Sequence, residues 1–374
     1  MNPMREFSIH PFWVVMIAVA MACACSEDPA EKNLADDQNL DDIDTASVAE
    51  VDSNTEHDTE SESDFHSDTG SDVETDTGSD VVTDTDTGTG IDTETDMGSD
   101  NGSWELDNGV LLVKFDPNAG GSMYYISESG KNYNVVNYHD KGRYIQQSYY
   151  AGQDLNRVGI GQHPSWSPWP WNPIQAGDTF NNKAIVLERI NNGSTIYIKT
   201  RPMLWDMNGE YAECEFETWA TLKGTAIHVK NRLTTHRTDN IWTEVIPKHQ
   251  ELPAVYTIGD LSNLYTYQGD KPWTNDALTQ IHNSGPPWAY WETSENWAAF
   301  VNDGDWGLGV YNKSRTLFVG GFHGVPYGGP TSASTGYISP LTTEALDKNS
   351  VFEYEYDLIL GNLSTIRSYV YQAQ

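Results

Sequence analysis

The sequence has few cysteines and few positive charges. Only three of its 374 residues are cysteines, and two of them, Cys23 and Cys25, lie near the N-terminus. The third, Cys214, has no second cysteine in the remainder of the chain, which excludes an internal disulfide framework there. Twenty-one basic residues stand against 55 acidic ones, for a formal net charge of −34. Without a basic stripe to neutralise phosphates, nucleic acid is not an expected partner.

The motifs of several enzyme classes are also absent. The chain contains no HExxH, G-x-S-x-G or P-loop pattern and no paired CxxC. Zincin, serine-hydrolase, nucleotide-binding and zinc-ribbon functions therefore lack support. We expect neither a metal nor another cofactor. His228, His236 and His282 are scattered along the chain, and we interpret them as structural residues.

The first 25 residues have the pattern of an export signal. Arg5 precedes an apolar run at residues 12–22, and small residues surround Cys23 and Cys25. This pattern is typical of a secretory signal peptide, and the run is shorter than the roughly 20 residues needed to span a bilayer. The alanine before each cysteine resembles a bacterial lipoprotein signal, with either cysteine as the lipidated residue. An ordinary cleaved signal is the alternative. We expect an exported protein, anchored by lipid at the outer membrane or cell surface, or otherwise secreted.

Residues 26–101 differ in composition from the remainder. They hold 26 of the 55 acidic residues and one lysine, with no tryptophan or tyrosine, and they repeat loosely, as in TDTGSDVETDTGSD. Such a segment cannot offset the entropy of ordering, so we predict a disordered acidic tether. The alternating aspartates Asp84, Asp86 and Asp92 loosely resemble a calcium loop, but the closing glutamate of such a loop is missing.

Residues 102–374 predict a single all-β domain. Apolar and polar residues alternate with period two in segments separated by turn signals such as DNG, NNG and KG. The best helix candidate, at residues 262–267, is only a turn or two long. Many strands without alternating helices predict a large antiparallel β-sandwich. The clearest predicted strands lie at residues 110–115, 184–188, 195–199, 226–232 and 351–359.

The order of these features resembles the galactose-mutarotase-like β-supersandwich. The resemblance is carried by the segment NGVLLVKFDPNAGGSMYYI, by Gly142 and Arg143, and by the strand pair in FETWATLKGTAIHVKNRLT. It implies a fold that sugar epimerases, glycoside hydrolases and polysaccharide lyases share. The chain departs from the sugar mutarotases at GRYIQQSYY, where their Asn-Arg pair is missing, and it has no histidine before a Tyr-Phe-Asn run. Mutarotase residues therefore cannot be carried over, and function must be argued from the site.

The stretch HPSWSPWPWNP, residues 163–173, places Trp166, Trp169 and Trp171 among four prolines. Proline suits neither helix nor strand, so we predict a rigid loop. A rigid aromatic loop can stack on the C–H faces of a sugar without a large ordering cost on binding. We interpret one or two of these tryptophans as sugar-stacking residues. The alternative is a hydrophobic lid on the sandwich.

Polar residues near this loop are candidates for substrate binding. A guanidinium, amides and phenols suit ligands rich in hydroxyl and carboxylate groups, although a solvent-facing row would have the same composition. Lys248 is added because it lies in the mixed cluster PKHQE, and His323 because it lies among glycines that allow close approach. From GRYIQQSYY the candidates are Arg143, Gln146, Gln147, Tyr149 and Tyr150.

Three places supply candidate acids and bases. His249 and Glu251, in PKHQELPAVYT, are the preferred pair, with a structural salt bridge as the alternative. Asp178 follows the tryptophan stretch. Glu217 is the last of three glutamates on one face of the strand in YAECEFETW, a face for which solvent exposure is the favoured interpretation.

These features predict an exported carbohydrate-active enzyme acting on a polysaccharide or oligosaccharide. Our first hypothesis is a glycoside hydrolase with two carboxylates, Glu251 paired with Asp178 or with a glutamate of the 213–217 row. The second is a polysaccharide lyase, in which a tyrosine of QQSYY or His249 removes a proton beside a uronate carboxylate held by Arg143 and Gln147. The third is a non-catalytic glycan-binding surface protein.

Overall fold

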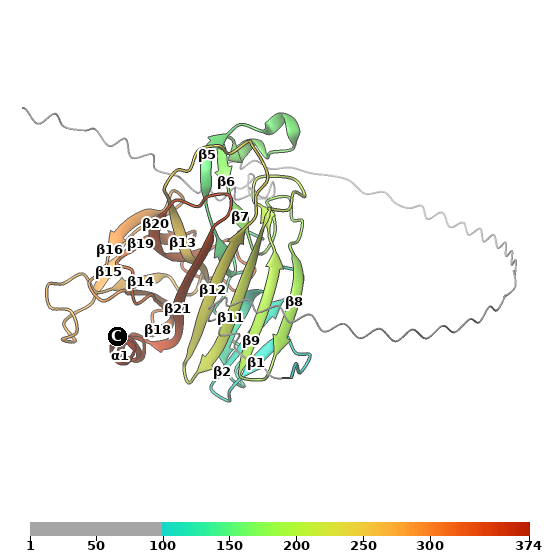
Figure 1. Cartoon of the computed structure of the whole chain (residues 1–374). Coiled ribbons are helices and arrows are strands. Elements are labelled where there is room, and N and C mark those ends of the chain that lie inside the picture. Colours follow the sequence, from blue (N-terminus) through green and yellow to red (C-terminus); the bar gives the residue numbers. More distant parts are fainter. Residues whose placement is uncertain (1–98) are drawn as a thin grey trace, which may run out of the picture. The chain divides into compact units, whose positions relative to one another are not determined.

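A computed structural model describes residues 99–374 and shows two large antiparallel β-sheets packed face to face (Figure 1). The predicted all-β sandwich is confirmed. Each predicted strand is present, because alternating side chains let a strand bury one face in the core. In β2 (Leu111–Asp116), for example, buried and half-buried residues alternate along the whole strand.

The first sheet has ten strands. They are β1 (Glu105–Asp107), β2, β3 (Ser122–Glu128), β4 (Ile145–Ser148), β7 (Pro173–Ile174), β10 (Met203–Leu204), β13 (Lys248–Ile258), β16 (Ala289–Glu292), β19 (Leu317–His323) and β20 (Thr335–Glu344). Their order is β1-β2-β3-β4-β13-β20-β19-β16, with β7 pairing with both β4 and β10. Strands from distant parts of the sequence therefore lie side by side at the centre, around β13.

The second sheet has nine strands in the order β15-β14-β17-β18-β21-β12-β11-β9-β8. Their bounds are β8 (Ile185–Asn191), β9 (Thr195–Arg201), β11 (Cys214–Lys223), β12 (Ala226–Thr235), β14 (Asn263–Thr266), β15 (Thr279–Ile281), β17 (Trp297–Val301), β18 (Trp306–Tyr311) and β21 (Val351–Asn362). A separate two-stranded sheet, β5 (Ala151–Leu155) and β6 (Trp169–Trp171), lies beyond one end of the sandwich (Figure 1).

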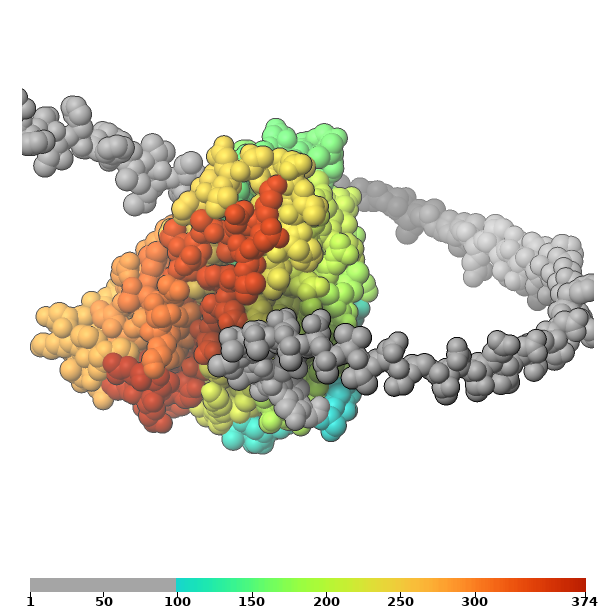
Figure 2. All heavy atoms as spheres, viewed as in Figure 1, coloured from blue at the N-terminus to red at the C-terminus, as the bar shows by residue number. Residues whose placement is uncertain are grey.

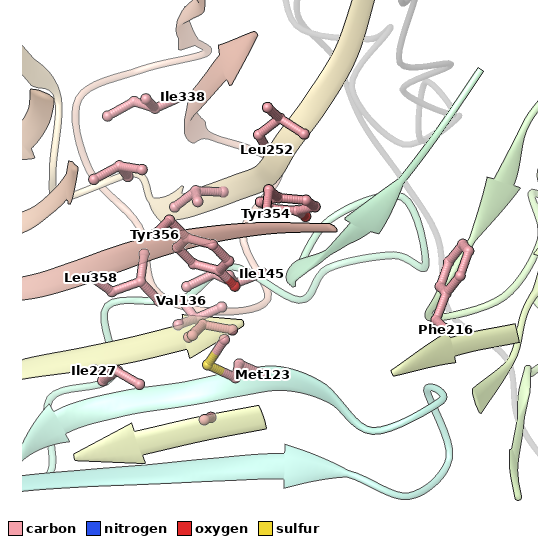
Figure 3. Close-up of a cluster of buried hydrophobic side chains, with 14 of the residues drawn as sticks. Met123, Val136, Ile145, Phe216, Ile227, Leu252, Ile338, Tyr354, Tyr356 and Leu358 are labelled. Atoms are coloured by element: carbon pink, nitrogen blue, oxygen red, sulfur yellow. The ribbon is translucent and has the colours of Figure 1, made fainter. Parts of the chain in front are cut away.

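The main core fills the space between the two large sheets. Figure 3 shows part of it, including Ile145 and Ile338 from the first sheet and Ile227 and Leu358 from the second. All four are at most 1% exposed. Burial of side chains of this size is the principal source of stability in a domain without disulfides.

The expected helix at residues 262–267 is wrong. Asn263–Thr266 form β14, because Leu264 and Thr266 are buried on one side while the backbone pairs with both β15 and β17. The only α-helix in the described part of the chain is α1 (Leu363–Ala373), which begins where the side chain of Asn362 accepts a hydrogen bond from Thr365 N. This is the usual N-cap arrangement.

Helix α1 packs on the outer side of the second sheet through Ile366 and Val370, which are four residues apart and share one helix face. It lies at the surface, at the lower left of Figure 2 in dark red. Its position is fixed by a buried ion pair in which Arg367 Nη2 lies 2.8 Å from Glu295 Oε1. The apolar stripe of α1, with Ile366 and Val370 as its buried members, is too short to indicate a helix from the sequence.

The predictions for Cys23, Cys25, the export signal and most of the acidic tether lie outside the described residues. At the start of the described part, Asp100 forms an ion pair with Arg189 of β8 at 2.9 Å. Asn101 N donates to the backbone oxygen of Asn191 at the end of the same strand. Among residues 99–374 there is no helix both long and apolar enough to cross a membrane.

Candidate functional site

The outer face of the first sheet, opposite the main core, carries a cluster of titratable and aromatic residues. Leu252 and Val255 of β13 point into the main core, whereas Ala254 and Tyr256 belong to a second apolar cluster on the outer face. The pairing of β13 with both neighbouring strands shifts register just after Glu251. Such a bulge re-aims side chains, and here it places Glu251 on the outer face.

Glu251 is buried and has one hydrogen-bonded oxygen. Its Oε1 accepts from the Tyr337 hydroxyl at 2.6 Å and from the Tyr150 hydroxyl at 3.4 Å. Its Oε2 is buried without a hydrogen-bond partner among the described residues, and the whole residue is 5% exposed. Loss of water raises the pKa of Glu251, although Tyr337, Ser148 and Tyr150 oppose the shift. The environment therefore favours the neutral carboxylic acid.

The two tyrosines that donate hydrogen bonds to Glu251 each pack against further aromatic rings. Tyr337 stacks on Tyr256, with ring centroids 4.7 Å apart, and contacts Trp288 at 5.2 Å. Tyr150 contacts Trp169 at 6.3 Å. Burial raises the pKa values of Tyr150 and Tyr337 well above that of free tyrosine, so both hydroxyls remain donors at neutral pH.

His249 and Tyr290 form the exposed side of this cluster. Residues two apart on a strand share a face, so His249 lies on the same side of β13 as Glu251. Its ring packs against Tyr290, with centroids 5.5 Å apart, and its Nδ1 lies 3.1 Å from the Thr343 hydroxyl. Tyr290 is 45% exposed. Partial loss of water lowers the pKa of His249, which favours a neutral imidazole able to accept a proton. We call Tyr150, His249, Glu251, Tyr290 and Tyr337 the Glu251 cluster.

Asp178 does not join this cluster. It is fully buried in a turn, where its two oxygens accept four hydrogen bonds, from the backbone of Phe180, Asn182 and Gly209 and from the Asn182 side chain. A carboxylate whose acceptor positions are filled by backbone donors organises a loop. The structure therefore provides no pairing of Asp178 with Glu251.

Glu217 lies on the far side of the sandwich from Glu251. Its neighbours Phe216 and Thr218 are buried beneath the second sheet, so Glu217 points outward from that sheet. There it accepts a hydrogen bond from Tyr197 at 2.8 Å and lies 3.6 Å from Arg232. The other two glutamates of the row are also engaged at the surface, Glu215 by Lys199 and Glu213 by Thr238. These contacts agree with the solvent-facing interpretation of the row.

Four residues of GRYIQQSYY have structural partners. The Arg143 guanidinium is 1% exposed and donates to the backbone oxygens at positions 332 and 333. The Gln146 amide bonds to backbone at three positions, including Ala176 N. Gln147 donates to Thr218 in the core and accepts from Tyr149. These groups connect loops and sheets, whereas Ser148 and Tyr150 of the stretch reach Glu251.

The tryptophan stretch is folded inward. It is not a loop throughout, because residues Pro164–Trp166 form a 3-10 turn and Trp169–Trp171 form β6, which pairs with β5. Trp166, Trp169 and Trp171 are 4%, 7% and 1% exposed. Trp171 belongs to the main core, and Trp166 contacts Trp169 and Trp205 edge to face. This geometry matches the hydrophobic-lid alternative, with the lid beside Tyr150.

Lys248 and His323 lie at strand ends. Lys248 Nζ forms an ion pair with Asp154 at 2.9 Å, which connects β13 to β5. The His323 Nδ1 lies 2.9 Å from the backbone oxygen of Gly285, in the loop that leads to Trp288. Neither contact brings the residue to the Glu251 carboxyl.

Three residues of the outer face were missed from the sequence: Tyr290, Tyr337 and Trp288. Their strands show alternation, in AYWE and TGYISP, but alternation does not say which side faces the core when both faces of a sheet are covered. Within residues 99–374, no group of three or more histidine, cysteine, aspartate or glutamate side chains is placed to bind a metal ion.

Comparison with known proteins finds only solved structures of low similarity. No family model and no curated protein matches the sequence. A galactose mutarotase related enzyme from Lactobacillus acidophilus has 9% identity and a TM-score of 0.41, over 69% of this chain and 96% of that one. A 4-alpha-glucanotransferase from Thermococcus litoralis has 12% identity and a TM-score of 0.38, over 69% of this chain and 39% of that one. A polysaccharide lyase has 12% identity and a TM-score of 0.34, over 71% and 35%. At these scores the similarities do not assign a function.

Proposed function

We propose that the domain is a carbohydrate-active enzyme that cleaves a uronate-containing glycan by β-elimination at the Glu251 cluster. The observation that carries the proposal is the buried Glu251 carboxyl, whose Oε2 has no partner among residues 99–374 and whose raised pKa favours the protonated form. A neutral carboxyl can donate a hydrogen bond to a substrate carboxylate, which an ionised one would repel.

Hydrolysis by paired carboxylates has less support from the geometry. That reaction needs two carboxyl groups about 5–10 Å apart. No other carboxylate contributes to the pKa shift of Glu251, and both predicted partners are engaged elsewhere, Asp178 in its turn and Glu217 on the other sheet. The described residues thus assemble one acid with tyrosines and a histidine, a set that suits proton abstraction beside a carboxylate.

In the proposed reaction, Glu251 donates a hydrogen bond to the uronate carboxylate and so stabilises the negative charge that develops when the neighbouring C5 proton leaves. His249, neutral because its pKa is lowered, takes that proton. The C4–O bond breaks as the C4=C5 double bond forms, and the leaving oxygen takes a proton from water. Because Glu251 is 5% exposed, substrate entry requires the exposed side chains of the cluster, His249 and Tyr290, to move.

We also propose that the protein is secreted or is anchored by lipid at the cell surface, as the N-terminal residues indicate. Export would bring the site to polysaccharides outside the cell. This part of the proposal rests on the sequence alone.

The test is incubation of the protein with a panel of neutral and uronate-containing polysaccharides, in which reducing ends and the ultraviolet absorbance of unsaturated uronate are followed together. An increase in both supports elimination. Reducing ends without absorbance would show a hydrolase and contradict elimination. No product, combined with retention on a glycan column, would show a binding protein.

Two substitutions at Glu251 separate its possible roles. Glu251→Gln keeps a hydrogen-bond donor at the Oε2 position but cannot transfer a proton, so elimination should retain measurable activity. Glu251→Ala removes the donor and should abolish it. If Glu251→Gln is as inactive as Glu251→Ala while both are folded, Glu251 is a general acid and the role proposed here is wrong.

A further inference from the structure

A second candidate ligand site lies near the start of α1, between strands β2 and β3 of the first sheet and strands β18 and β21 of the second. A cavity of about 240 Å³ opens there. It is below the roughly 300–1,000 Å³ of sites for drug-sized ligands, which limits the occupant to a small molecule. The lining residues that matter are Leu111, Leu360, Trp306, Glu128, Asn362 and Thr365.

The floor of this cavity is apolar and its rim is polar. Leu111 and Leu360 are 1% and 3% exposed and belong to the main core. Trp306 is half-buried, and Tyr133 packs against its indole with ring centroids 5.5 Å apart, which fixes the ring at the edge of the cavity. An indole beside aliphatic carbons offers the surface on which the C–H groups of a sugar ring pack.

The rim offers hydrogen-bonding groups that have no partner among the described residues. The Asn362 oxygen accepts from Ser364 and Thr365 as the cap of α1, which leaves its amide nitrogen available. No hydrogen bond or ion pair within residues 99–374 engages the Thr365 hydroxyl or the Glu128 carboxylate. A donor, a hydroxyl and a carboxylate acceptor around one indole match the hydroxyl groups of a sugar.

We propose that this cavity binds a single neutral sugar ring, as an ancillary site separate from the Glu251 cluster. Neutral ligands are favoured because the lining contains no lysine or arginine to neutralise an anion, and its single carboxylate opposes a uronate. The two sites would then differ in ligand class. The ancillary site would hold a polymer or a cell-surface glycan by a neutral residue, whereas the Glu251 cluster would act on an acidic one.

The test is titration of the full chain with D-glucose, D-galactose and D-mannose. Calorimetry and saturation-transfer NMR detect the binding. D-glucuronate serves as the anionic comparator. The structure predicts saturable binding of at least one neutral sugar and weaker binding of glucuronate, which the Glu128 carboxylate repels. Preferential binding of glucuronate, or no saturable binding of any neutral sugar into the millimolar range, would overturn the proposal.

Substitutions locate the binding. Thr365→Val removes one hydroxyl and keeps the side-chain shape, so affinity should fall about 3- to 10-fold, as expected for one lost hydrogen bond. Trp306→Leu should reduce it further, and the exposed Thr274→Val is the matched control. Binding unchanged in Thr365→Val and Trp306→Leu would place the ligand elsewhere and refute this site. Because Glu251→Gln leaves the cavity intact, binding should persist in that variant whether or not the elimination proposed above is correct.

Discussion

The Tyr337 hydroxyl lies 2.6 Å from Oε1 of Glu251, on a neighbouring strand 86 residues away in the sequence. The same carboxyl has a second oxygen that is buried without a partner among residues 99–374. A carboxyl that is half satisfied is a poor structural element, because an unpartnered buried polar atom costs free energy. This imbalance supports the proposal that Glu251 binds a substrate.

Replacement of Glu251 by glutamine should stabilise the protein at neutral pH. Burial raises the folded-state pKa of Glu251 above its unfolded value of 4.5. The folded state therefore binds the proton more tightly than the unfolded state, and stability is greatest below the unfolded pKa and falls as pH rises through the folded one. Glutamine does not ionise, so the wild type and Glu251→Gln should be similar in acid and diverge as pH rises. Urea denaturation of both proteins across pH measures this.

Replacement of His249 should change the pH profile of cleavage and leave the fold unchanged. The lowered pKa of His249 means that its neutral form predominates from a lower pH than for free histidine, so activity should rise with pH through that lowered pKa. In His249→Gln this rise should disappear along with most of the activity. His323→Gln, on β19, serves as the control. An unchanged pH profile in His249→Gln would eliminate this histidine as the base.

Removal of the buried partner of α1 should destabilise the C-terminus strongly. Glu295 is fully buried, and Arg367 binds it at 2.8 Å. Glu295→Gln should cost about 3–5 kcal/mol, since it leaves a buried cation unpaired. By contrast, the exposed pair of Arg232 and Glu353 should contribute less than about 1 kcal/mol. Chemical denaturation and hydrogen exchange of α1 measure both effects. Equal losses of stability on breaking the two pairs would contradict the stronger contribution expected of the buried pair.

Glu295 should also make the protein acid-sensitive. Burial opposes ionisation of Glu295, but hydrogen bonds from Arg367, Trp273, Tyr371 and Trp297 outweigh it and lower the pKa. Stability from this group is therefore present above the unfolded pKa of 4.5 and is lost as pH falls through the lower folded value. An acid denaturation profile that is the same in Glu295→Gln and the wild type would contradict this.

The tryptophan stretch should behave as part of the core. Trp171 is 1% exposed, so Trp171→Ala should cost about 3–5 kcal/mol of folding free energy. Trp166→Ala, in the lid beside Tyr150, should also destabilise and should disturb the Glu251 cluster through Trp169. Thermal unfolding measures the cost. Unchanged stability together with lost glycan retention would instead restore the sugar-stacking interpretation.

The local pattern of the sequence was sufficient to predict the main strands and two residues of the candidate site. Period-two alternation located β2, β8, β9, β12 and β21, since a strand that buries one side must alternate. The residue types in PKHQELPAVYT indicated His249 and Glu251 as a candidate pair, and that pair remains at the centre of the candidate site. The prolines of this segment suggested a loop, but the structure shows strand β13, which places both residues on one face.

The tertiary structure decided which residues meet that pair. In the sequence, Asp178 and Glu217 were carboxylate candidates on the same footing as Glu251. In the structure, Asp178 accepts hydrogen bonds from backbone donors in a turn, and Glu217 lies on the outer face of the second sheet. Tyr337 and Tyr290 reach Glu251 and His249 only because β20, β19 and β16 add to β13 from residues far along the chain. Alternation fixes which side chains share a face, but it carries no information on which strands become neighbours or which face is covered. Those choices depend on long-range pairing and packing, and they determine where this protein places the Glu251 carboxyl.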